Sequence, residues 1–251
     1  MIDESRPSIE PAPSPWELPD PRFAEPGDEL LGLGADLAAG TMLAAYRKGL
    51  FPMGVELPQG RAMRHFRGET ALGWWSPNPR GVLRPTNFHR SRSLGSAIRR
   101  FRVTFDEAFD NVLLKCADPT REHGWIDTEF IDAYRQLHVL GWAHSVEVWA
   151  DEPHGTAVLA GGLFGIEIGG LFAAESMFHS VTNASKVALW ALADRLRRAD
   201  AAQERIIDTQ WSTPHLASLG IEQWTREEYL RYLPTVLEAA PALCAGPNST
   251  R

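Results

Sequence analysis

Short apolar segments alternate with helix-forming patterns along most of this chain. Strands are expected where apolar side chains alternate or run together, at 101–105, 144–150, 157–178 and 206–210. Helices are expected where a capping side chain precedes apolar residues at helical spacing: after Asp106, after Asp127, after Asn183 or Ser185, and after Thr225 with Glu228. The pair Gly169-Gly170 is placed to turn 157–178 into a hairpin. From about residue 81, this order predicts a mixed sheet with helices on its faces.

The first part of the chain follows another pattern. Residues 1–30 are Pro-rich and acidic, which predicts an extended lead, and 41–48 form a short amphipathic helix that Gly49 ends. Residues 51–60 are expected to form a loop, and 74–80 (WWSPNPR) a strand end that runs into a rigid turn. We therefore predict an α+β protein with a small N-terminal α/β domain over 1–78, including the acidic lead, and a larger domain over 79–251.

Composition limits the class of protein. The 251 residues are 44% hydrophobic and 23% charged, which is ordinary for a globular protein with a core. The N-terminus lacks the basic and apolar regions of a signal peptide, and the longest apolar run, 157–166, is too short to span a bilayer. Cys116 and Cys244 provide neither a disulfide framework nor a metal-binding cluster. A cytoplasmic protein without membrane attachment is therefore expected.

The charges are unevenly distributed. The net charge of −7 argues against a nucleic acid partner, and residues 1–30 hold eight acids and two arginines. Residues 70–105, in contrast, hold seven arginines and no acid. Such a basic segment can bind a polyanion locally, although a solvated basic surface explains it equally well.

Several familiar motifs are absent from the sequence. Neither GxGxxG after a strand nor GxxxxGK[ST] occurs, and there is no HExxH and no GxSxG. These absences disfavour NTP hydrolysis, zinc chemistry and serine hydrolysis. They leave transfer chemistry that needs neither a metal nor another cofactor.

Two acids stand in apolar strands. Glu175 lies within LFAAESMF, and Asp208 within RIIDTQ. A buried charge costs several kcal/mol unless it is paired or used, so both acids indicate a site. Asp208 and Gln210 are two apart on a strand and share a face, where a carboxylate and an amide can hold an amine. The alternative is a buried Asp that accepts backbone N–H groups.

Other residues suggest a pocket around these acids. Glu175 and Met177 share a face of their strand, and Leu163 and Ile207 lie on neighbouring strands, so that together they are able to line an apolar pocket with an acidic rim. The alternative is plain core with one paired Glu. Trp125 is either a lid over such a pocket or an ordinary packed Trp. Lys186, at a helix start, suits a phosphate, or else is a surface Lys beside a helix cap.

Eleven motifs, in order between about residues 18 and 232, resemble one family, the leucyl/phenylalanyl-tRNA–protein transferases. They are LLGLGADL (30–37), LAAYRKGLFP (43–52), WWSPNPR (74–80), HRSRSL (89–94), GWI (124–126), AYRQLH (133–138), HSVEVW (144–149), ESMF (175–178), NASK (183–186), IIDTQ (206–210) and HLASLG (215–220).

The resemblance implies a function. Members move Leu or Phe, and Met less well, from an aminoacyl-tRNA to a protein that begins with Arg or Lys, which marks that protein for degradation by the bacterial N-degron route. The resemblance implies no metal and no CoA, and a catalytic domain, here 79–251, like the acetyltransferase (GNAT) superfamily. The expected partners are aminoacyl-tRNA and acceptor proteins, the expected state is a monomer, and no membrane is involved.

The resemblance also implies roles for individual residues. The catalytic residues are Asp208, Gln210 and Glu175; the substrate pocket is formed by Trp125, Leu163, Phe172, Met177, Ile207 and Met53; and the residues near the acceptor end of the tRNA are Arg80, Arg90, Arg92 and Lys186. In the family, the carboxylate at 208 polarises the amide at 210, which draws a proton from the acceptor amine. Because an amide is a poor base, our hypothesis is that Asp208 anchors the amine electrostatically and Gln210 orients it.

Three positions depart from the family pattern: Met53 stands in place of a Trp, Ala174 in place of a Gly, and Thr209 in place of a Cys. The flexible Met53 predicts weaker selectivity for Phe over Met. Phe172 does not alternate in phase with Glu175, and a bulge at Ala173-Ala174 would reconcile them. Two other functions stay open, a CoA-dependent N-acetyltransferase and a non-catalytic tRNA-binding module.

Overall fold

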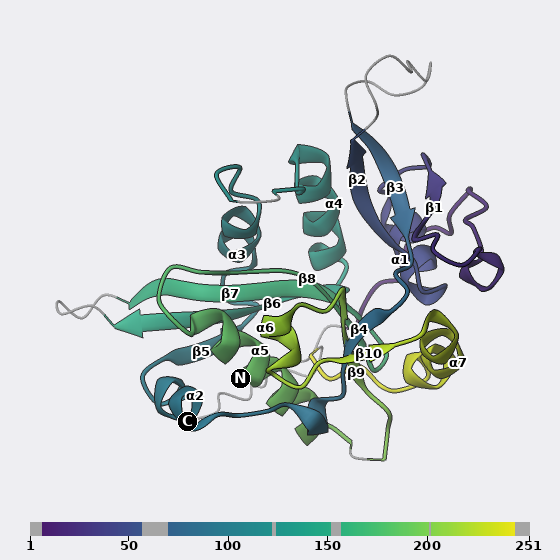
Figure 1. Ribbon diagram of the computed structural model, residues 1–251. Helices are drawn as coiled ribbons and strands as arrows, with labels where there is room; N and C mark the ends of the chain where they lie inside the picture. Colours follow the sequence, from purple (N-terminus) through teal and green to yellow (C-terminus); the bar gives the residue numbers. More distant parts are fainter. Residues whose placement is uncertain (1–6, 57–69, 122–123, 152–156, 201, 244–251) are drawn as a thin grey trace.

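The computed structural model describes residues 7–56, 70–121, 124–151, 157–200 and 202–243 (Figure 1). The first sheet has three antiparallel strands in the order β1-β3-β2. The elements of this part are η1 (Pro21–Phe23), β1 (Leu30–Leu33), α1 (Ala39–Arg47), β2 (Phe51–Glu56) and β3 (Thr70–Trp75). Helix α1 buries Ala45 against Leu50 and Trp74, which joins the helix to this sheet.

The second sheet has seven strands in the order β10-β4-β9-β8-β7-β6-β5. Its strands are β4 (Arg80–Leu83), β5 (Arg102–Phe105), β6 (Ala143–Asp151), β7 (Ala157–Ile168), β8 (Leu171–His179), β9 (Ile206–Gln210) and β10 (Glu222–Trp224). The helices of this part are η2 (Pro85–Asn87), α2 (Arg92–Ile98), α3 (Phe109–Cys116), α4 (Thr128–Val139), α5 (Ala184–Arg198), α6 (Pro214–Ala217) and α7 (Arg226–Leu237). Strands β8 and β9 are parallel, and α5 connects them.

Helices cover both faces of the large sheet (Figure 1). On one face, α1, α3 and α4 bury their apolar sides against Phe164, Ile166 and Ala173. On the other face, α2 and α5 pack on Leu163 and Phe172. Helix α7 covers the end of the sheet at β4 and β9. The predicted mixed α+β class, with helices on the faces of a mixed sheet, is confirmed.

Several local predictions are confirmed. The hairpin at Gly169-Gly170 joins β7 to β8, with Ile168 opposite Leu171. The side chain of Asp127 accepts the first free N–H groups of α4, and Thr225 forms the expected capping box at the start of α7.

Other local predictions are wrong. The first residues of the expected loop 51–60 form β2, an edge strand, where Pro52 is tolerated; residues 57–60 lie outside the described residues. Asp106 does not cap α3, because its φ is 58° and its carboxylate binds His144 and the backbone of Ser145. At the start of α5, Asn183 takes the cap position without a side-chain hydrogen bond.

The two sheets divide the chain between Trp75 and Arg80. The large core nevertheless joins side chains from both sides of this division, since α1 packs on it. A domain boundary at residue 78 stays a prediction. None of the described helices is both long and apolar enough to cross a bilayer.

Candidate active site

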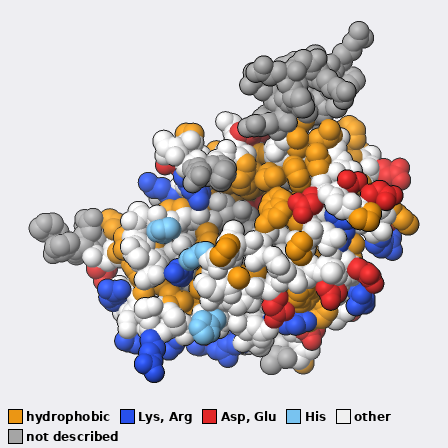
Figure 2. Space-filling model, in the orientation of Figure 1, with side chains coloured by type: hydrophobic (Ala, Val, Ile, Leu, Met, Phe, Trp, Pro, Cys, Tyr) orange, Lys and Arg blue, Asp and Glu red, His pale blue; other side chains and the backbone are white. Residues whose placement is uncertain are grey.

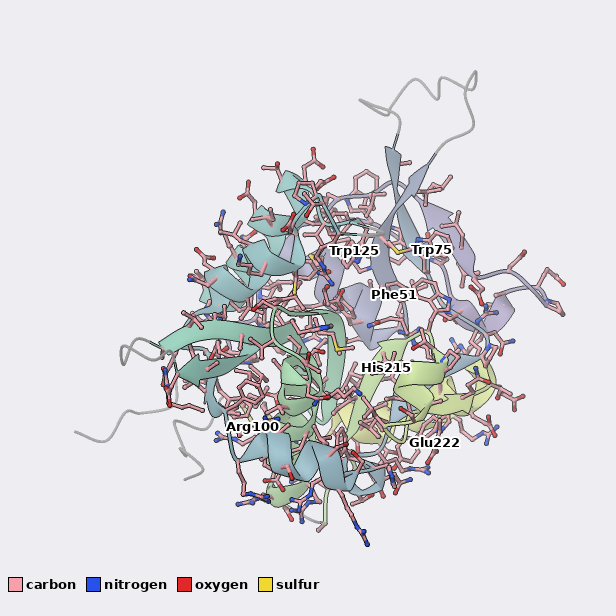
Figure 3. The ribbon with its side chains drawn as sticks, turned by 60° about the vertical axis from the view of Figure 1, so that its left-hand side comes forward. Phe51, Trp75, Arg100, Trp125, His215 and Glu222 are labelled. Carbon is pink, nitrogen blue, oxygen red and sulfur yellow. The ribbon has the colours of Figure 1, made fainter. Side chains whose placement is uncertain are left out.

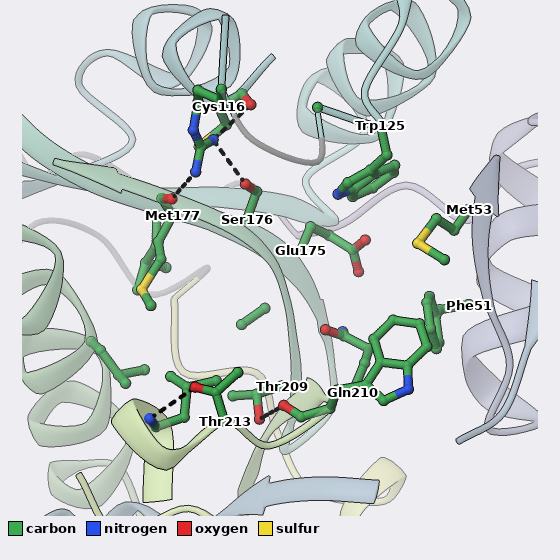
Figure 4. Close-up of a pocket in the computed structure, with 17 residues that line it drawn as sticks. Phe51, Met53, Cys116, Trp125, Glu175, Ser176, Met177, Thr209, Gln210 and Thr213 are labelled. Carbon is green, nitrogen blue, oxygen red and sulfur yellow. Dashed lines mark hydrogen bonds between the residues drawn. The ribbon is translucent and has the colours of Figure 1, made fainter. Parts of the chain in front are cut away.

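A cavity of about 370 Å³ opens where β8 and β9 separate. The two parallel strands pair from Leu171 opposite Ile206 to Ala173 opposite Asp208, and beyond this point they are no longer paired. The cavity is lined by residues from both sheets and from α3, α5 and α6: Phe51, Met53, Cys116, Arg121, Gly124, Trp125, Leu163, Ala174, Glu175, Ser176, Met177, Leu189, Thr209, Gln210, Trp211, Thr213 and Leu216. Figure 4 shows Trp125, Glu175, Met53 and Gln210 around the same space.

Glu175 is the extra residue of a β-bulge. Phe164 of β7 lies opposite Ser176 and Gly165 opposite Ala174, so Glu175 has no partner residue in the pairing. The bulge was predicted one position earlier, at Ala173-Ala174. Because of the shift, Glu175 turns toward α1 and α4 while Met177 packs toward α5. The expectation that these two side chains share a face is therefore wrong, although both line the cavity.

Two tyrosines hold the Glu175 carboxyl group. The hydroxyl of Tyr46 donates to Oε1 at 2.8 Å, and that of Tyr134 donates to Oε2 at 2.7 Å. Glu175 is 9% exposed. Burial raises its pKa from 4.5 to about 7, and the two hydroxyl groups offset only part of this rise. A carboxyl group with this pKa exchanges a proton near neutral pH, as a general acid or base must.

Asp208 lies behind the cavity rather than in it. Its side chain is fully buried, and its carboxylate forms an ion pair with Arg80, in which Nη2 lies 2.6 Å from Oδ2. The Tyr229 hydroxyl also donates to Oδ2, at 2.9 Å. Asp208 therefore has no surface on the cavity with which to contact an amine, and its role as an electrostatic anchor stays a prediction. The carboxylate instead accepts the backbone N–H of Gln210 at 2.9 Å, which fixes the end of β9.

Arg80 is also a correction to the sequence-based prediction. Its side chain is 1% exposed, so it is not available to a tRNA. Burial by itself would lower the pKa of Arg80, but the adjacent Asp208 raises it above its ordinary value. Strand β4 lies beside β9 with Val82 opposite Asp208, and this register brings the two charges together.

Gln210 presents its side chain to the cavity. Its φ of 55° turns the chain away from β9. The oxygen and nitrogen of an amide are assigned from their hydrogen bonds, and here Nε2 belongs on the backbone carbonyls of Ala174, at 3.0 Å, and Thr209, at 3.1 Å. With both N–H groups used, the side-chain oxygen is the group left to accept a hydrogen bond from a ligand.

The predicted pocket residues divide into two groups. Met53, Trp125, Leu163 and Met177 line the cavity as expected. Phe172 and Ile207 do not, because both are fully buried in the core between the sheet and α5. They pack on the same side of the sheet as the cavity-lining Leu163 and Leu189 but have no surface on the cavity, so their part in the substrate pocket stays a prediction.

Sequence reasoning missed an aromatic wall. Trp211 packs edge-to-face on Phe51, with ring centroids 5.2 Å apart, and on Trp75 at 6.1 Å. Trp211 also donates to Glu29 from its indole nitrogen at 3.1 Å. Trp211 directly follows the candidate site residue Gln210 in the sequence, and this position could have indicated that it lines the site. Tyr46 and Tyr134, which reach Glu175 from distant helices, were also missed, although each lies in a motif of the resemblance, at 43–52 and 133–138.

Trp125 is a packed residue that also lines the cavity, and its role as a lid stays a prediction. Its ring packs edge-on against Phe130, at 5.1 Å between centroids, and against Tyr134 at 6.4 Å, and it also lines the cavity. Figure 3 shows Trp125, Phe51 and Trp75 in one region of the molecule, with Arg100 well apart from them.

Of the basic residues expected near tRNA, Arg90 and Arg92 are exposed and Lys186 is half-buried at the start of α5. In the described ranges, no group of three or more His, Cys, Asp or Glu side chains is arranged to hold a metal ion.

Comparison with known proteins identifies the family. The model of a family described as Leucyl/phenylalanyl-tRNA protein transferase matches residues 82–234. The chain belongs to this family. Proteins named Leucyl/phenylalanyl-tRNA--protein transferase from Aeromonas hydrophila subsp. hydrophila, Tolumonas auensis and Desulfatibacillum aliphaticivorans are 42%, 41% and 44% identical to it. These matches cover 86%, 92% and 88% of this chain and the same shares of the three relatives.

Membership of the leucyl/phenylalanyl-tRNA–protein transferases confirms the resemblance predicted from the eleven motifs, and places the chain among aminoacyltransferases. One solved structure, a tandem GNAT protein from the clavulanic acid biosynthesis pathway (without AcCoA), aligns with 72% of this chain and 63% of its own at 13% identity. Its TM-score of 0.34 is too low for this likeness to carry an argument.

The three departures from the family pattern gather at one place. Met53, Ala174 and Thr209 all line the cavity, although they come from β2, β8 and β9. The three positions at which the sequence was expected to depart from the family pattern therefore all line the candidate site.

Proposed function

We propose that this protein transfers Leu or Phe, and Met less well, from aminoacyl-tRNA to the N-terminal Arg or Lys of acceptor proteins. The proposal includes the cytoplasm as its location and the N-degron route as its purpose. The observation that carries it is the cavity, in which an apolar recess meets one carboxyl group and one amide oxygen. Family membership supports the same reaction.

The apolar recess suits an amino acid side chain without a branch at Cβ. Leu163, Met177 and Leu189 form an aliphatic wall, and Met53 and Trp125 complete the lining. A Leu, Phe or Met side chain enters such a recess with its Cβ methylene, whereas Val and Ile carry an extra methyl group there. One methyl group accounts for about 1–3 kcal/mol of discrimination, so the recess alone separates these side chains by roughly 10–200-fold.

The reaction exchanges an ester for an amide. The acceptor amine attacks the ester carbon, a C–N bond forms, and the C–O bond to the tRNA ribose breaks. The amine must lose one proton, and the ribose oxygen must gain one. Glu175, whose pKa is raised to about 7 by burial, carries this proton from the amine to the ribose oxygen. The side-chain oxygen of Gln210 accepts a hydrogen bond from the amine and orients it. Since an ester is already activated, positioning supplies much of the remaining rate.

The acceptor brings a positive charge to the cavity. Acidic residues come from the N-terminal segment, where Glu29 binds the cavity-lining residue Trp211. We propose that this side of the cavity receives the Arg or Lys side chain of the acceptor.

A transfer assay tests the proposed function. Purified protein is incubated with radiolabelled Leu-tRNA or Phe-tRNA and a peptide that begins with Arg, with a Val-initial peptide as the control. We expect label on the Arg-initial peptide alone, and loss of transfer in Gln210→Ala. Label on neither peptide, or acetylation of the peptide from acetyl-CoA, would refute the proposal.

A further inference from the structure

A second cavity, of about 440 Å³, lies beside the first. It is lined by residues from the end of α3, the end of β8 and the starts of α5 and α6: Lys115, Asp118, Arg121, Met177, Phe178, His179, Ser180, Ser185 and His215. Its volume lies within the range of about 300–1,000 Å³ that small-ligand sites occupy. The transfer chemistry described above does not use it.

The two cavities share a wall. Arg121 and Met177 line both of them. The guanidinium of Arg121 is fixed there, since Nη1 donates to the carbonyl of Cys116 at 2.7 Å and Nη2 to that of Met177 at 2.7 Å (Figure 4). A ligand that extends out of the first cavity past Met177 therefore enters the second beside a fixed positive charge.

The second cavity is lined by more positive than negative charge. Lys115, Arg121, His179 and His215 are its basic side chains. The pKa of its one acid, Asp118, lies below its ordinary value, chiefly because Thr120 donates to the carboxylate from its hydroxyl and its backbone N–H, and Lys115 and Arg121 together help to hold it there. In Figure 2, His side chains lie on the left of the molecule, which carries α3, α5 and α6, and acidic side chains gather mainly toward β1–β3 and α7; Lys and Arg side chains lie on both sides, with the largest group at the lower left near α2.

Further observations indicate a positive potential at this place. The pKa of His215 lies below its ordinary value, first because of burial and then because Lys186 and His179 are close. The helix α5 also begins at this cavity, with Ser185 on its wall, and the positive end of the helix dipole faces the same space.

We propose that the second cavity binds the phosphodiester that joins the last two nucleotides of the aminoacyl-tRNA. This inference rests on the proposed function. In an aminoacyl-tRNA the amino acid is esterified to the ribose of the last nucleotide, and the 5′-phosphate of that ribose is the nearest anionic group. If the amino acid occupies the apolar cavity, this phosphate must lie close to its mouth, and the basic cavity adjoins it. The acceptor, with its N-terminal Arg or Lys, is repelled from the same place.

Three Phe donors that differ in phosphate content test the inference. They are Phe-tRNA, a cytidylyl-adenosine dinucleotide that carries Phe and has a single phosphodiester, and phenylalanyl-adenosine, which has none. Transfer to an Arg-initial peptide is measured for wild type, Lys115→Ala and His215→Ala. Arg22→Ala, on the exposed η1 turn, is the matched control for loss of a basic side chain.

We expect both cavity variants to raise KM for Phe-tRNA and for the dinucleotide. In Lys115→Ala at about 0.2 M salt the increase should be about threefold, because a contact that releases about 0.7 counterion favours binding by roughly this factor relative to 1 M salt. The slope of log KM against log salt falls by about 0.7 in Lys115→Ala, the value for one contact to a single strand. In both cavity variants, KM for phenylalanyl-adenosine stays at the wild-type level. In Arg22→Ala, KM stays at the wild-type level for all three donors.

Two results would overturn the inference. One is an equal rise in KM for all three donors, because the substitutions would then alter the protein fold or the binding of the amino acid, and not the binding of a phosphate. The other is wild-type KM and salt dependence for every donor. Absence of transfer by the wild-type protein from all donors is a different result, because it refutes the proposed function itself.

Discussion

The hydroxyl groups of Tyr46 and Tyr134 control how readily Glu175 gives up its proton. Each donates to one carboxyl oxygen, and each therefore stabilises the ionised form. The change Tyr134→Phe removes one of these hydrogen bonds and retains the ring. We expect the pKa of Glu175 to rise further from its value of about 7, because burial is then opposed by a single hydroxyl.

The size of the shift follows from the strength of the lost bond. A hydrogen bond to a charged group is worth about 1.5–3 kcal/mol, and 1.36 kcal/mol corresponds to one pKa unit, so the shift is about one to two units upward. If the ionised carboxylate is the form that accepts the proton of the amine, transfer requires a higher pH in the variant. At pH 7.5 the ionised fraction falls roughly tenfold for a shift of about 1.5 units.

The assay is the pH dependence of kcat/KM for transfer to an Arg-initial peptide. The rising limb of wild type should have a midpoint near 7, and that of Tyr134→Phe should lie at about 8–9. A second limb from the acceptor amine, near ~8, is the same for both proteins. Tyr232→Phe is the matched control, since Tyr232 binds Glu204 on the surface and not Glu175.

A limb that stays in place in Tyr134→Phe, or moves to lower pH, would refute this reasoning. So would a shift of equal size in Tyr232→Phe. Titration of the Glu175 carboxyl carbon by NMR in the same proteins separates an unchanged pKa from a reaction that does not depend on this group.

Three further predictions concern the same site. Because folding raises the pKa of Glu175 from 4.5 to about 7, the free energy of unfolding falls as the pH rises from 4.5 to 7 and the buried carboxyl group must ionise. Glu175→Gln should abolish this decrease, so that at pH 8 its free energy of unfolding, measured in urea, exceeds that of wild type by up to about 3 kcal/mol. A variant whose stability depends on pH as that of wild type does would contradict this. Arg80→Gln should destabilise the fold by about 3–5 kcal/mol, since it leaves Asp208 unpaired, without weakening tRNA binding by the folded protein in filter assays; weaker binding would restore Arg80 as a tRNA contact. Met53→Trp should increase the preference for Phe over Met in competition between the two charged tRNAs, and an unchanged ratio would show that Met53 does not set it.

The sequence predicted what depends on local pattern. Glu175 was expected in an apolar strand, and it is there because its neighbours on β8 are core residues. The hairpin at Gly169-Gly170 and the cap at Asp127 were found for the same reason, since each depends on a few adjacent side chains.

The errors arose where distant segments decide the outcome. Arg80 appeared to belong to a solvated basic segment, because nothing near it in sequence indicates that β4 lies beside β9 and brings it to Asp208. The partners of Glu175 are 129 and 41 residues away, so its pKa followed only from the packing of α1 and α4. Pro52 suggested a loop, but at the edge of a sheet its missing N–H costs no pairing.

The proposed function requires the cavity between β8 and β9 to hold the amino acid during transfer. A crystal structure with a non-hydrolysable, amide-linked phenylalanyl-adenosine tests it most directly. We predict density for the phenyl ring among Met53, Trp125, Leu163 and Met177, with the amide carbonyl between Glu175 and Gln210. Density that places the phenyl ring elsewhere, or the adenine in the apolar recess, would contradict this requirement.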